Sequence, residues 1–292
     1  MHDCCHSHTK FDSLFDKDLL KLLNHYFIPL ALFICSIPTL WAQTTIDLGA
    51  AQVVISSRPT TRELNSLTML VEEVERRTLI RWQTSDVWPS NSNPVIIVGS
   101  RDWISDLLDS PVQLPSLLPQ TKQVEGYQIE VLQEEPVPVV FVIGSDERGL
   151  LFGIGRLLRE LHMAQGKIMI PASLSISTSP KFALRGHQMG YRPKTNSYDG
   201  WTPEIWEQYI RDHIVFGMNA MELIPPRSDD SPDSPHFPLP PLEMMIRVSE
   251  ILDKYGLDVW IWYPALDEDY SDPATIEFAL SEWAEVFAAL PR

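Results

Sequence analysis

The sequence predicts an α/β fold built from two consecutive parts, and three observations predict it. Apolar and polar residues alternate over residues 44–56, as is typical of strands. From residue 181 onward, short apolar runs alternate with helical patterns, which favours a parallel sheet. The length of 292 residues suggests two domains at about 150 residues each. We therefore expect a small α+β domain over residues 43–180 and a second α/β domain over residues 181–292.

Composition limits the classes of partner. Hydrophobic residues make up 44% of the chain and charged residues 21%, which is ordinary for a globular protein. The formal net charge of -16 argues against nucleic acid or an anionic membrane surface, because phosphate groups are bound by clustered Lys and Arg. All three cysteines, Cys4, Cys5 and Cys35, precede residue 43. The rest of the chain therefore has neither a disulfide nor a reactive thiolate.

The first 42 residues have the pattern of an export leader. Residues 27–40 form an apolar run of signal-peptide length, which is short for a membrane span. Lys17 and Lys21 precede the run, and the small residue Ala42 follows it. We predict cleavage after Ala42, export to the periplasm or the outside, and no stable membrane insertion of the mature chain.

In the first domain, Thr60 and Glu63 form a capping-box pattern that predicts a helix start. The runs PVIIVGS, EGYQIEVLQ and VPVVFVIGS each predict a strand, and the last two predict a strand pair. A strand-to-helix turn follows in GSDERGLLFGIGRLLRELHM. Its glycines match neither GxGxxG nor a P-loop, so they predict a tight turn and close helix packing rather than nucleotide binding.

The second domain reads as three strand–helix units. The expected strands are RGHQMGYR, residues 219–225 and residues 257–264, and the third is apolar enough to predict burial on both faces. The expected helices are PEIWEQYIRDHIVFG, LEMMIRVSEILDKYG and ATIEFALSEWAEVFAAL. Thr202 and Asp272 stand at cap positions before the first and third helices, and glycines close the first two.

Three units cannot close an eight-stranded barrel, which takes roughly 250 residues. The region is then either an open three-unit sheet or the start of an incomplete TIM barrel. An open sheet would leave apolar faces and an unpaired strand edge exposed, so the incomplete barrel is favoured.

Two stretches resemble glycoside hydrolases. GSDERGLLFGIGRLLREL resembles the strand-to-helix segment of the accessory domain that precedes the barrel in α-glucuronidases of family 67 and in hexosaminidases of families 20 and 84. The stretch from Arg185 to Asp230 resembles the first two barrel units of families 84 and 20, including the phrase Gly217-Met218-Asn219. The tryptophan-rich third strand and the segment 264–267 match none of these families closely.

The resemblance implies a fold, an activity and a partner. The fold would be an α+β accessory domain followed by the first three βα units of a TIM barrel. The activity would be that of an exported glycoside hydrolase, of α-glucuronidase or N-acetylhexosaminidase type, with a carbohydrate substrate and no metal or organic cofactor. The catalytic carboxyl groups of these families lie on later strands, so none is named and this chain alone is expected to be inactive. The alternative is a non-catalytic carbohydrate-binding or scaffold protein that is complete at 292 residues.

The candidate substrate-binding residues follow the three strands, because the carboxyl ends of barrel strands carry the active site. The resemblance implies a sugar-contacting role for Arg192 and Arg227 and matches Asp229 and Asp230 to a family pair of aspartates. An ion pair that only folds the loop is the alternative for Arg227 and its aspartates. After the third strand, the candidates are Trp262, Tyr263 and Asp267.

Three further features favour a structural interpretation. Trp260 is assigned to the core, because tryptophan within a strand is most often buried. His187 is expected to be a core histidine, with an orientation into the barrel mouth as the alternative. The acidic segment DEDYSD lacks the glycine and the spacing of an EF-hand, so we expect no metal there.

Overall fold

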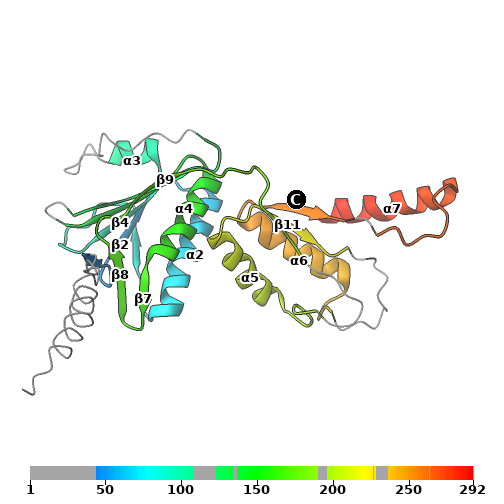
Figure 1. Ribbon diagram of the computed structural model, residues 1–292, viewed down its shortest axis with the longest axis horizontal. Helices are drawn as coiled ribbons and strands as arrows, with labels where there is room; N and C mark the ends of the chain where they lie inside the picture. Colours follow the sequence, from blue (N-terminus) through cyan, green and yellow to red (C-terminus); the bar gives the residue numbers. More distant parts are fainter. Residues whose placement is uncertain are drawn as a thin grey trace, which may run out of the picture. The chain divides into compact units, whose positions relative to one another are not determined.

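The computed structural model describes residues 44–107, 123–133, 137–189, 196–225, 227, 236–262 and 264–291. All of them belong to one compact unit, Thr44–Arg292. The predicted leader therefore lies outside the described residues. Helices are interspersed with strands along this unit (Figure 1). Among the helices described, none has the length and apolar character needed to cross a membrane.

A six-stranded sheet forms the core of the first domain. Its strand order is β3-β2-β4-β6-β5-β9, with β5 antiparallel to β6 and β9 and the other neighbours parallel. The strands are β2 (Gln52–Ile55), β3 (Gln83–Ser85), β4 (Val95–Ser100), β5 (Tyr127–Leu132), β6 (Val139–Gly144) and β9 (Ser175–Thr178). The predicted pair β5 and β6 is confirmed.

Helices cover both faces of this sheet. One core contains α2 (Thr61–Thr78) and α4 (Glu147–Glu160), which pack on the face that carries Val53 and Ile96. The other core places α3 (Arg101–Leu107) against the face that carries Val54 and Ile97. Because both faces are covered, β4 and β6 are almost entirely buried.

A second small sheet, in the order β1-β8-β7, is antiparallel throughout. It contains β1 (Thr45–Asp47), β7 (His162–Ala164) and β8 (Lys167–Pro171). The sequence did not predict β3, β7, β8, β9 or α3. These elements are short, and β3 and β9 pair with strands that lie far away in the chain, so no strong local pattern marks them. β7 and β8 pair with each other across a short turn, and the sequence missed this hairpin.

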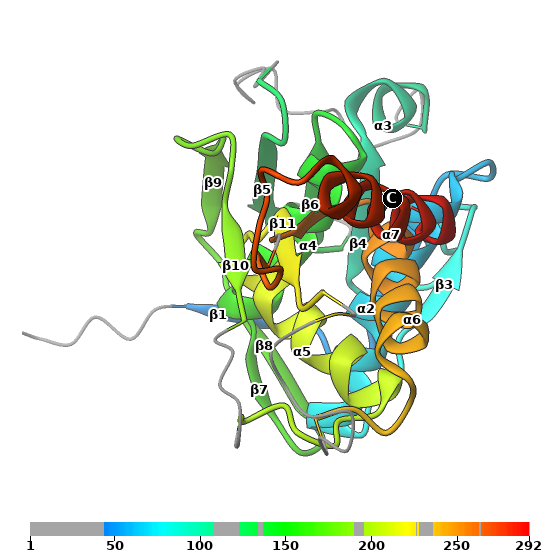
Figure 2. The ribbon, with the colours of Figure 1, turned by 90° about the vertical axis from the view of Figure 1, so that its right-hand side faces the viewer.

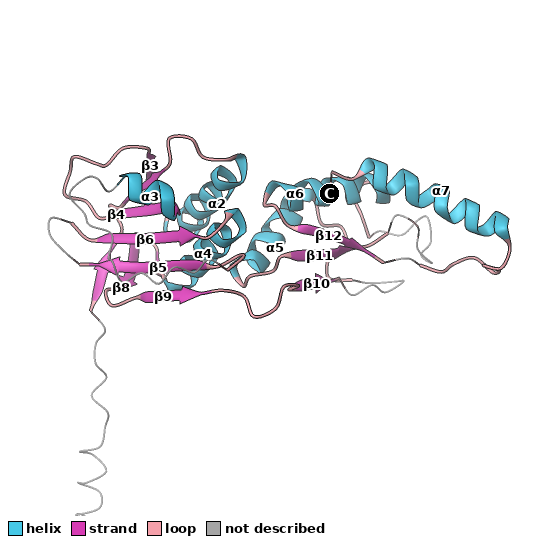
Figure 3. Ribbon diagram, turned by 90° about the horizontal axis from the view of Figure 1, so that it is seen from above, coloured by secondary structure: helices cyan, strands magenta, loops and turns pink. Residues whose placement is uncertain are grey.

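The third sheet has the order β10-β11-β12 and is parallel (Figure 3). Its strands are β10 (Gly186–Gln188), β11 (Ala220–Leu223) and β12 (Asp258–Ile261), and each is followed by a helix: α5 (Pro203–Val215), α6 (Pro241–Lys254) and α7 (Pro273–Ala289). Helices α5 and α6 cover one face of the sheet (Figure 2). The predicted alternation of strands and helices is thus confirmed.

The helix ends follow the predicted chemistry with one exception. Thr60 and Glu63 form the reciprocal capping box of α2, and Asp272 caps α7 through the backbone N–H of Ala274. Thr202 stands at the N-cap of α5, but its side chain makes no capping hydrogen bond. Gly256 follows α6 with a φ of +70°, a left-handed conformation that favours glycine.

A buried carboxylate, Glu125, joins the first domain to the three parallel strands. It accepts hydrogen bonds from Arg185 Nη2 at 2.5 Å, Arg148 Nη1 at 3.1 Å and Asn219 Nδ2 at 3.2 Å. Arg185 and Asn219 directly precede β10 and β11, and Arg148 also binds Asp258, the first residue of β12, at 2.6 Å. One carboxylate therefore fixes the amino-terminal ends of all three strands.

Burial acts to raise the pKa of Glu125, but the hydrogen bonds from Arg185, Asn219 and Arg148 outweigh it and hold the pKa below its ordinary value of 4.5. The carboxylate therefore stays charged in the folded protein at neutral pH. Its contribution to stability is present above pH 4.5 and is lost as the pH falls through the lower folded pKa.

A second ionic cluster joins helices α2, α5 and α6. Arg211 donates to Glu72 at 2.6 Å, to Glu207 at 2.7 Å and to the Tyr255 hydroxyl at 2.8 Å. Lys254 adds a bond to Glu207 at 2.7 Å. Burial acts to raise the pKa of Glu207, but the hydrogen bonds from Lys254, Tyr255 and Arg211 lower it to about 2. The two clusters together tie the first domain to the parallel sheet.

The substitution Glu125→Gln should destabilise the protein by about 3 kcal/mol at pH 7, because it leaves two arginines without their shared carboxylate. The midpoint of urea unfolding measures this change. Between pH 7 and pH 3 the unfolding free energy of the unsubstituted protein should also fall more steeply than that of Glu125→Gln.

Glu250→Gln is the matched control, because Glu250 pairs with Arg247 on the surface with both side chains about half exposed. Its effect should stay within about 0.5 kcal/mol. Equal effects of the two substitutions would contradict a special role for Glu125.

Candidate functional site

The two faces of the parallel sheet carry different residues. His187 lies on the helix-covered face, where its Nε2 lies 2.7 Å from the Tyr209 hydroxyl and its ring lies 4.2 Å from that of His213. Burial, and then the nearby His213, lower the pKa of His187. His187 is therefore a core histidine packed against α5, and it does not face the opposite side of the sheet.

The opposite face carries a row of three polar or aromatic side chains. Gln188 pairs with Glu222 across β10 and β11, and Glu222 pairs with Trp260 across β11 and β12. Neighbouring strands lie about 4.8 Å apart and residues in register share a face, so the three side chains stand side by side. We call Gln188, Glu222 and Trp260 the open-face row.

The open-face row lies toward the carboxyl ends of the strands. Gln188 is the last residue of β10, and Glu222 and Trp260 are the last but one of β11 and β12. Gln188 is exposed and Glu222 is partly buried. The row offers an amide that donates and accepts, a carboxylate that accepts and an indole with a flat apolar face. This combination suits a ligand with both hydroxyl groups and an apolar face.

The assignment of Trp260 to the core is wrong, because its side chain is 54% exposed. It points away from the helices, on the face that no described element covers. The expectation that the third strand is buried on both faces fails for the same reason. Trp262 follows β12 directly and is partly buried. Glu222 and Gln188 were missed, although Glu222 is the one polar position in the strand AMEL and so marks the open face.

Arg227 and Asp267, two predicted site residues, are brought together. The Arg227 guanidinium donates to both oxygens of Asp267, at 2.7 and 3.2 Å, and to Glu282 of α7 at 3.0 Å. It also lies 5.3 Å from the ring centre of Phe278. The hydrogen bond from Arg227 holds the pKa of Asp267 below its ordinary value, and the carboxylates raise the pKa of Arg227.

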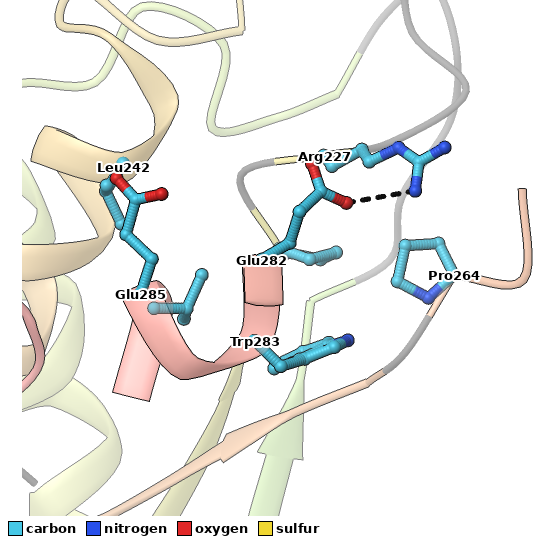
Figure 4. A pocket seen from close by; sticks show the side chains of 8 residues that line it. Arg227, Leu242, Pro264, Glu282, Trp283 and Glu285 are labelled. Atoms are coloured by element: carbon cyan, nitrogen blue, oxygen red, sulfur yellow. Dashed lines mark hydrogen bonds and ion pairs between the residues drawn. The ribbon is translucent and has the colours of Figure 1, made fainter. Parts of the chain in front are cut away.

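Arg227 therefore bridges two connections, the loop after β11 and the loop after β12. This arrangement differs from an ion pair inside a single loop, which the sequence left open. A pocket of about 210 Å³ lies beside it, lined by Pro225, Arg227, Leu242, Pro264, Glu282, Trp283, Glu285 and Val286. Figure 4 shows Glu282 directed toward Arg227, with Glu285 farther along α7 and Leu242 near the start of α6. We call this cavity the rim pocket.

A further contact joins the loops after β10 and β11. His236, which is 3% exposed, pairs through Nδ1 with Asp199, and the amide of Asn196 lies 3.3 Å from the same nitrogen. The backbone N–H of Gly200 donates to the His236 carbonyl at 3.1 Å. No local pattern predicts this pair, because its two partners are 37 residues apart. It fixes one loop against the other at the carboxyl edge of the sheet.

Four predicted site residues, Arg192, Asp229, Asp230 and Tyr263, lie outside the described residues. Their roles stay predictions. In the parts of the chain that the structure describes, no group of three or more His, Cys, Asp or Glu side chains could hold a metal ion.

No family model matches the chain, and no curated protein matches it. Solved structures do match. The chitobiase of Flavobacterium johnsoniae, a family 20 protein, matches with a TM-score of 0.53 and 14% identity over 86% of this chain and 42% of its own. The family 84 protein CpGH84B matches with a TM-score of 0.50 and 15% identity, over 84% and 40%. The family 115 4-O-methyl-α-glucuronidase BtGH115A matches with a TM-score of 0.53 and 15% identity, over 82% and 34%.

The chain thus spans less than half of the length of each of these glycoside hydrolases. The predicted resemblance to families 20 and 84 is confirmed at the level of the fold. The α-glucuronidase among these three belongs to family 115, whereas the sequence resemblance named family 67. The fold is the mixed α/β arrangement seen in part of each of these enzymes.

The substitution Arg227→Met should raise the pKa of Asp267 toward its ordinary value of 3.8, because it removes the largest cause of the lowering. Carbon-13 NMR of the carboxyl groups across pH 2–6 measures the titration midpoint. Asp269 is an internal control, because its pKa is lowered by hydrogen bonds from Ser271 and should not move. A midpoint of Asp267 that stays unchanged would show that the pair does not form in solution.

Proposed function

We propose that this protein is part of an exported glycoside hydrolase and that the carboxyl edge of β10–β12 forms one wall of its carbohydrate site. The observation that carries the proposal is the open-face row, which lies on a sheet whose fold is similar to three glycoside hydrolases. In barrel enzymes, residues at the carboxyl ends of the strands bind the substrate.

The chemistry of the row supports this role. Glu222 accepts hydrogen bonds from sugar hydroxyls, and Gln188 both donates and accepts them. The exposed indole of Trp260 offers an apolar surface to the carbon-bound face of a sugar ring. Arg227, Asp267 and Trp262 are proposed to shape the rim of the same site, next to the rim pocket.

Hydrolysis needs two carboxyl groups that flank the glycosidic bond, or one carboxyl group and a group of the substrate. We propose that the catalytic carboxyl groups come from barrel strands beyond the three seen here. The described residues supply the binding wall, and the acid and the nucleophile are not assigned among them.

The surface of the parallel sheet supports a longer barrel. Among the described strands, β12 pairs with β11 alone, so its other edge is open. The α7 residues Phe278, Leu280 and Phe287 are also exposed. Several large exposed apolar side chains on one helix are typical of a surface that another element covers. We propose that further barrel strands and helices cover this surface in the assembled enzyme.

The chain in its native host should have a mass well above 33.3 kDa if the barrel continues. Intact mass spectrometry of the protein from its own cells measures this, and sequencing of the mature amino terminus checks the proposed export. The expected first residue after cleavage is Gln43. A mass equal to that of the present chain without residues 1–42 would contradict the barrel proposal.

The substitution Trp260→Ala should weaken the binding of oligosaccharides by about tenfold, because it removes the largest apolar surface of the row. Isothermal titration calorimetry with chito-oligosaccharides measures the affinity. Phe182→Ala is the control, because Phe182 is an exposed aromatic residue that precedes β10 at the opposite edge of the sheet. Unchanged affinity in Trp260→Ala, or equal losses in both variants, would argue against the open-face row as the sugar-binding wall.

A further inference from the structure

We propose that Glu222 is a specificity-determining residue that biases the site toward neutral and amino-bearing sugars and against uronic acids. This inference rests on the proposed function and deepens it, because it selects among the carbohydrate classes that the fold likeness leaves open. It follows from the distribution of charge over the carboxyl edge of the parallel sheet.

The position of Glu222 exposes a bound sugar to its charge. It is the central member of the open-face row, flanked in register by Gln188 on one side and Trp260 on the other. Neither neighbour carries a charge. Within the residues that the structure describes, no Lys, Arg or His bonds to Glu222. A sugar stacked on Trp260 would therefore place its substituents within a few ångströms of an uncompensated carboxylate.

Basic groups that could bind a uronate are scarce in the described loops. In the described parts of the loops after β10, β11 and β12, Arg227 is the only Lys or Arg. Asp267 occupies both of its terminal nitrogens, and Glu282 adds a second carboxylate. Its charge is therefore already balanced by two negative groups. A uronate carboxylate would have to displace one of them.

Carboxylates dominate the described part of the carboxyl edge. The same described loop segments carry five acidic residues, Asp199, Asp267, Glu268, Asp269 and Asp272, and Glu222 adds to them on the strand. Like charges at short range in a partly buried site repel, while an ammonium group is attracted. The edge thus favours an amino sugar over a neutral sugar, and a neutral sugar over a uronic acid.

The test compares three monosaccharide glycosides that differ in charge: methyl glucosaminide, methyl glucoside and methyl glucuronide. Binding to the full chain is measured by saturation-transfer NMR and calorimetry at low and high salt. We expect the glucuronide to bind on the order of tenfold more weakly than the glucoside, as for one repulsive pair in a partly buried site. High salt should reduce the difference.

Glu222→Gln should raise the affinity for the glucuronide several-fold and lower that for the glucosaminide, with the glucoside little changed. Glu277→Gln is the matched control, because it removes the same charge from an exposed position of α7 and should leave the order unchanged. Arg192→Gln tests a basic candidate that lies outside the described residues, because a uronate held by Arg192 would lose affinity in this variant.

The outcomes separate the two proposals. Tighter binding of the glucuronide to the unsubstituted chain, or loss of that binding in Arg192→Gln, would overturn the inference and leave the proposed function intact. The same ratios of the three affinities in Glu222→Gln as in the unsubstituted chain would also overturn it. If none of the three glycosides binds and chito-oligosaccharides do not bind either, the proposed function fails, and the inference fails with it.

Discussion

The arrangement of the parallel sheet depends on one buried carboxylate, Glu125. It comes from the first domain, yet its hydrogen-bond donors, Arg185, Asn219 and Arg148, determine where the three strands begin. A charge this deeply buried is unfavourable alone and becomes favourable only when its partners are in place. The amino-terminal edge of the sheet is therefore fixed as a single ionic unit. The register of β10, β11 and β12, on which the open-face row depends, follows from it.

The two ends of the parallel sheet differ in the balance of acidic and basic groups. At the amino-terminal edge, acidic and basic groups are matched and largely withdrawn from solvent. At the carboxyl edge, carboxylates outnumber basic groups in the described loops, and Glu222 faces the open side. A rigid, neutralised base thus supports an acidic, more accessible rim. This division matches the general rule that one end of a barrel maintains stability while the other carries function.

The sequence predicted most of the helices and the alternation of the second domain, because caps such as Thr60 with Glu63 and a 3.6-residue periodicity are local signals. Pairing across strands is not local. The bond between Arg227 and Asp267 joins residues 40 apart, so the sequence named both residues without predicting their contact. Trp260 was misplaced because an apolar strand does not reveal which of its faces is covered. Gln188 and Glu222 became visible as a pair only through the register of β10 and β11.

The backbone conformation of Glu125 limits which residues can occupy this position. Its φ is +59°, a conformation that glycine adopts freely and that asparagine and aspartate tolerate better than glutamate does. Glycine, asparagine or aspartate would relax the backbone, but none of them has a side chain long enough to reach Arg148, Arg185 and Asn219 together. Two selective pressures thus oppose each other at one position. Random mutation there should be tolerated far less than at the exposed turns nearby, and relatives that share this junction should keep glutamate despite its strain.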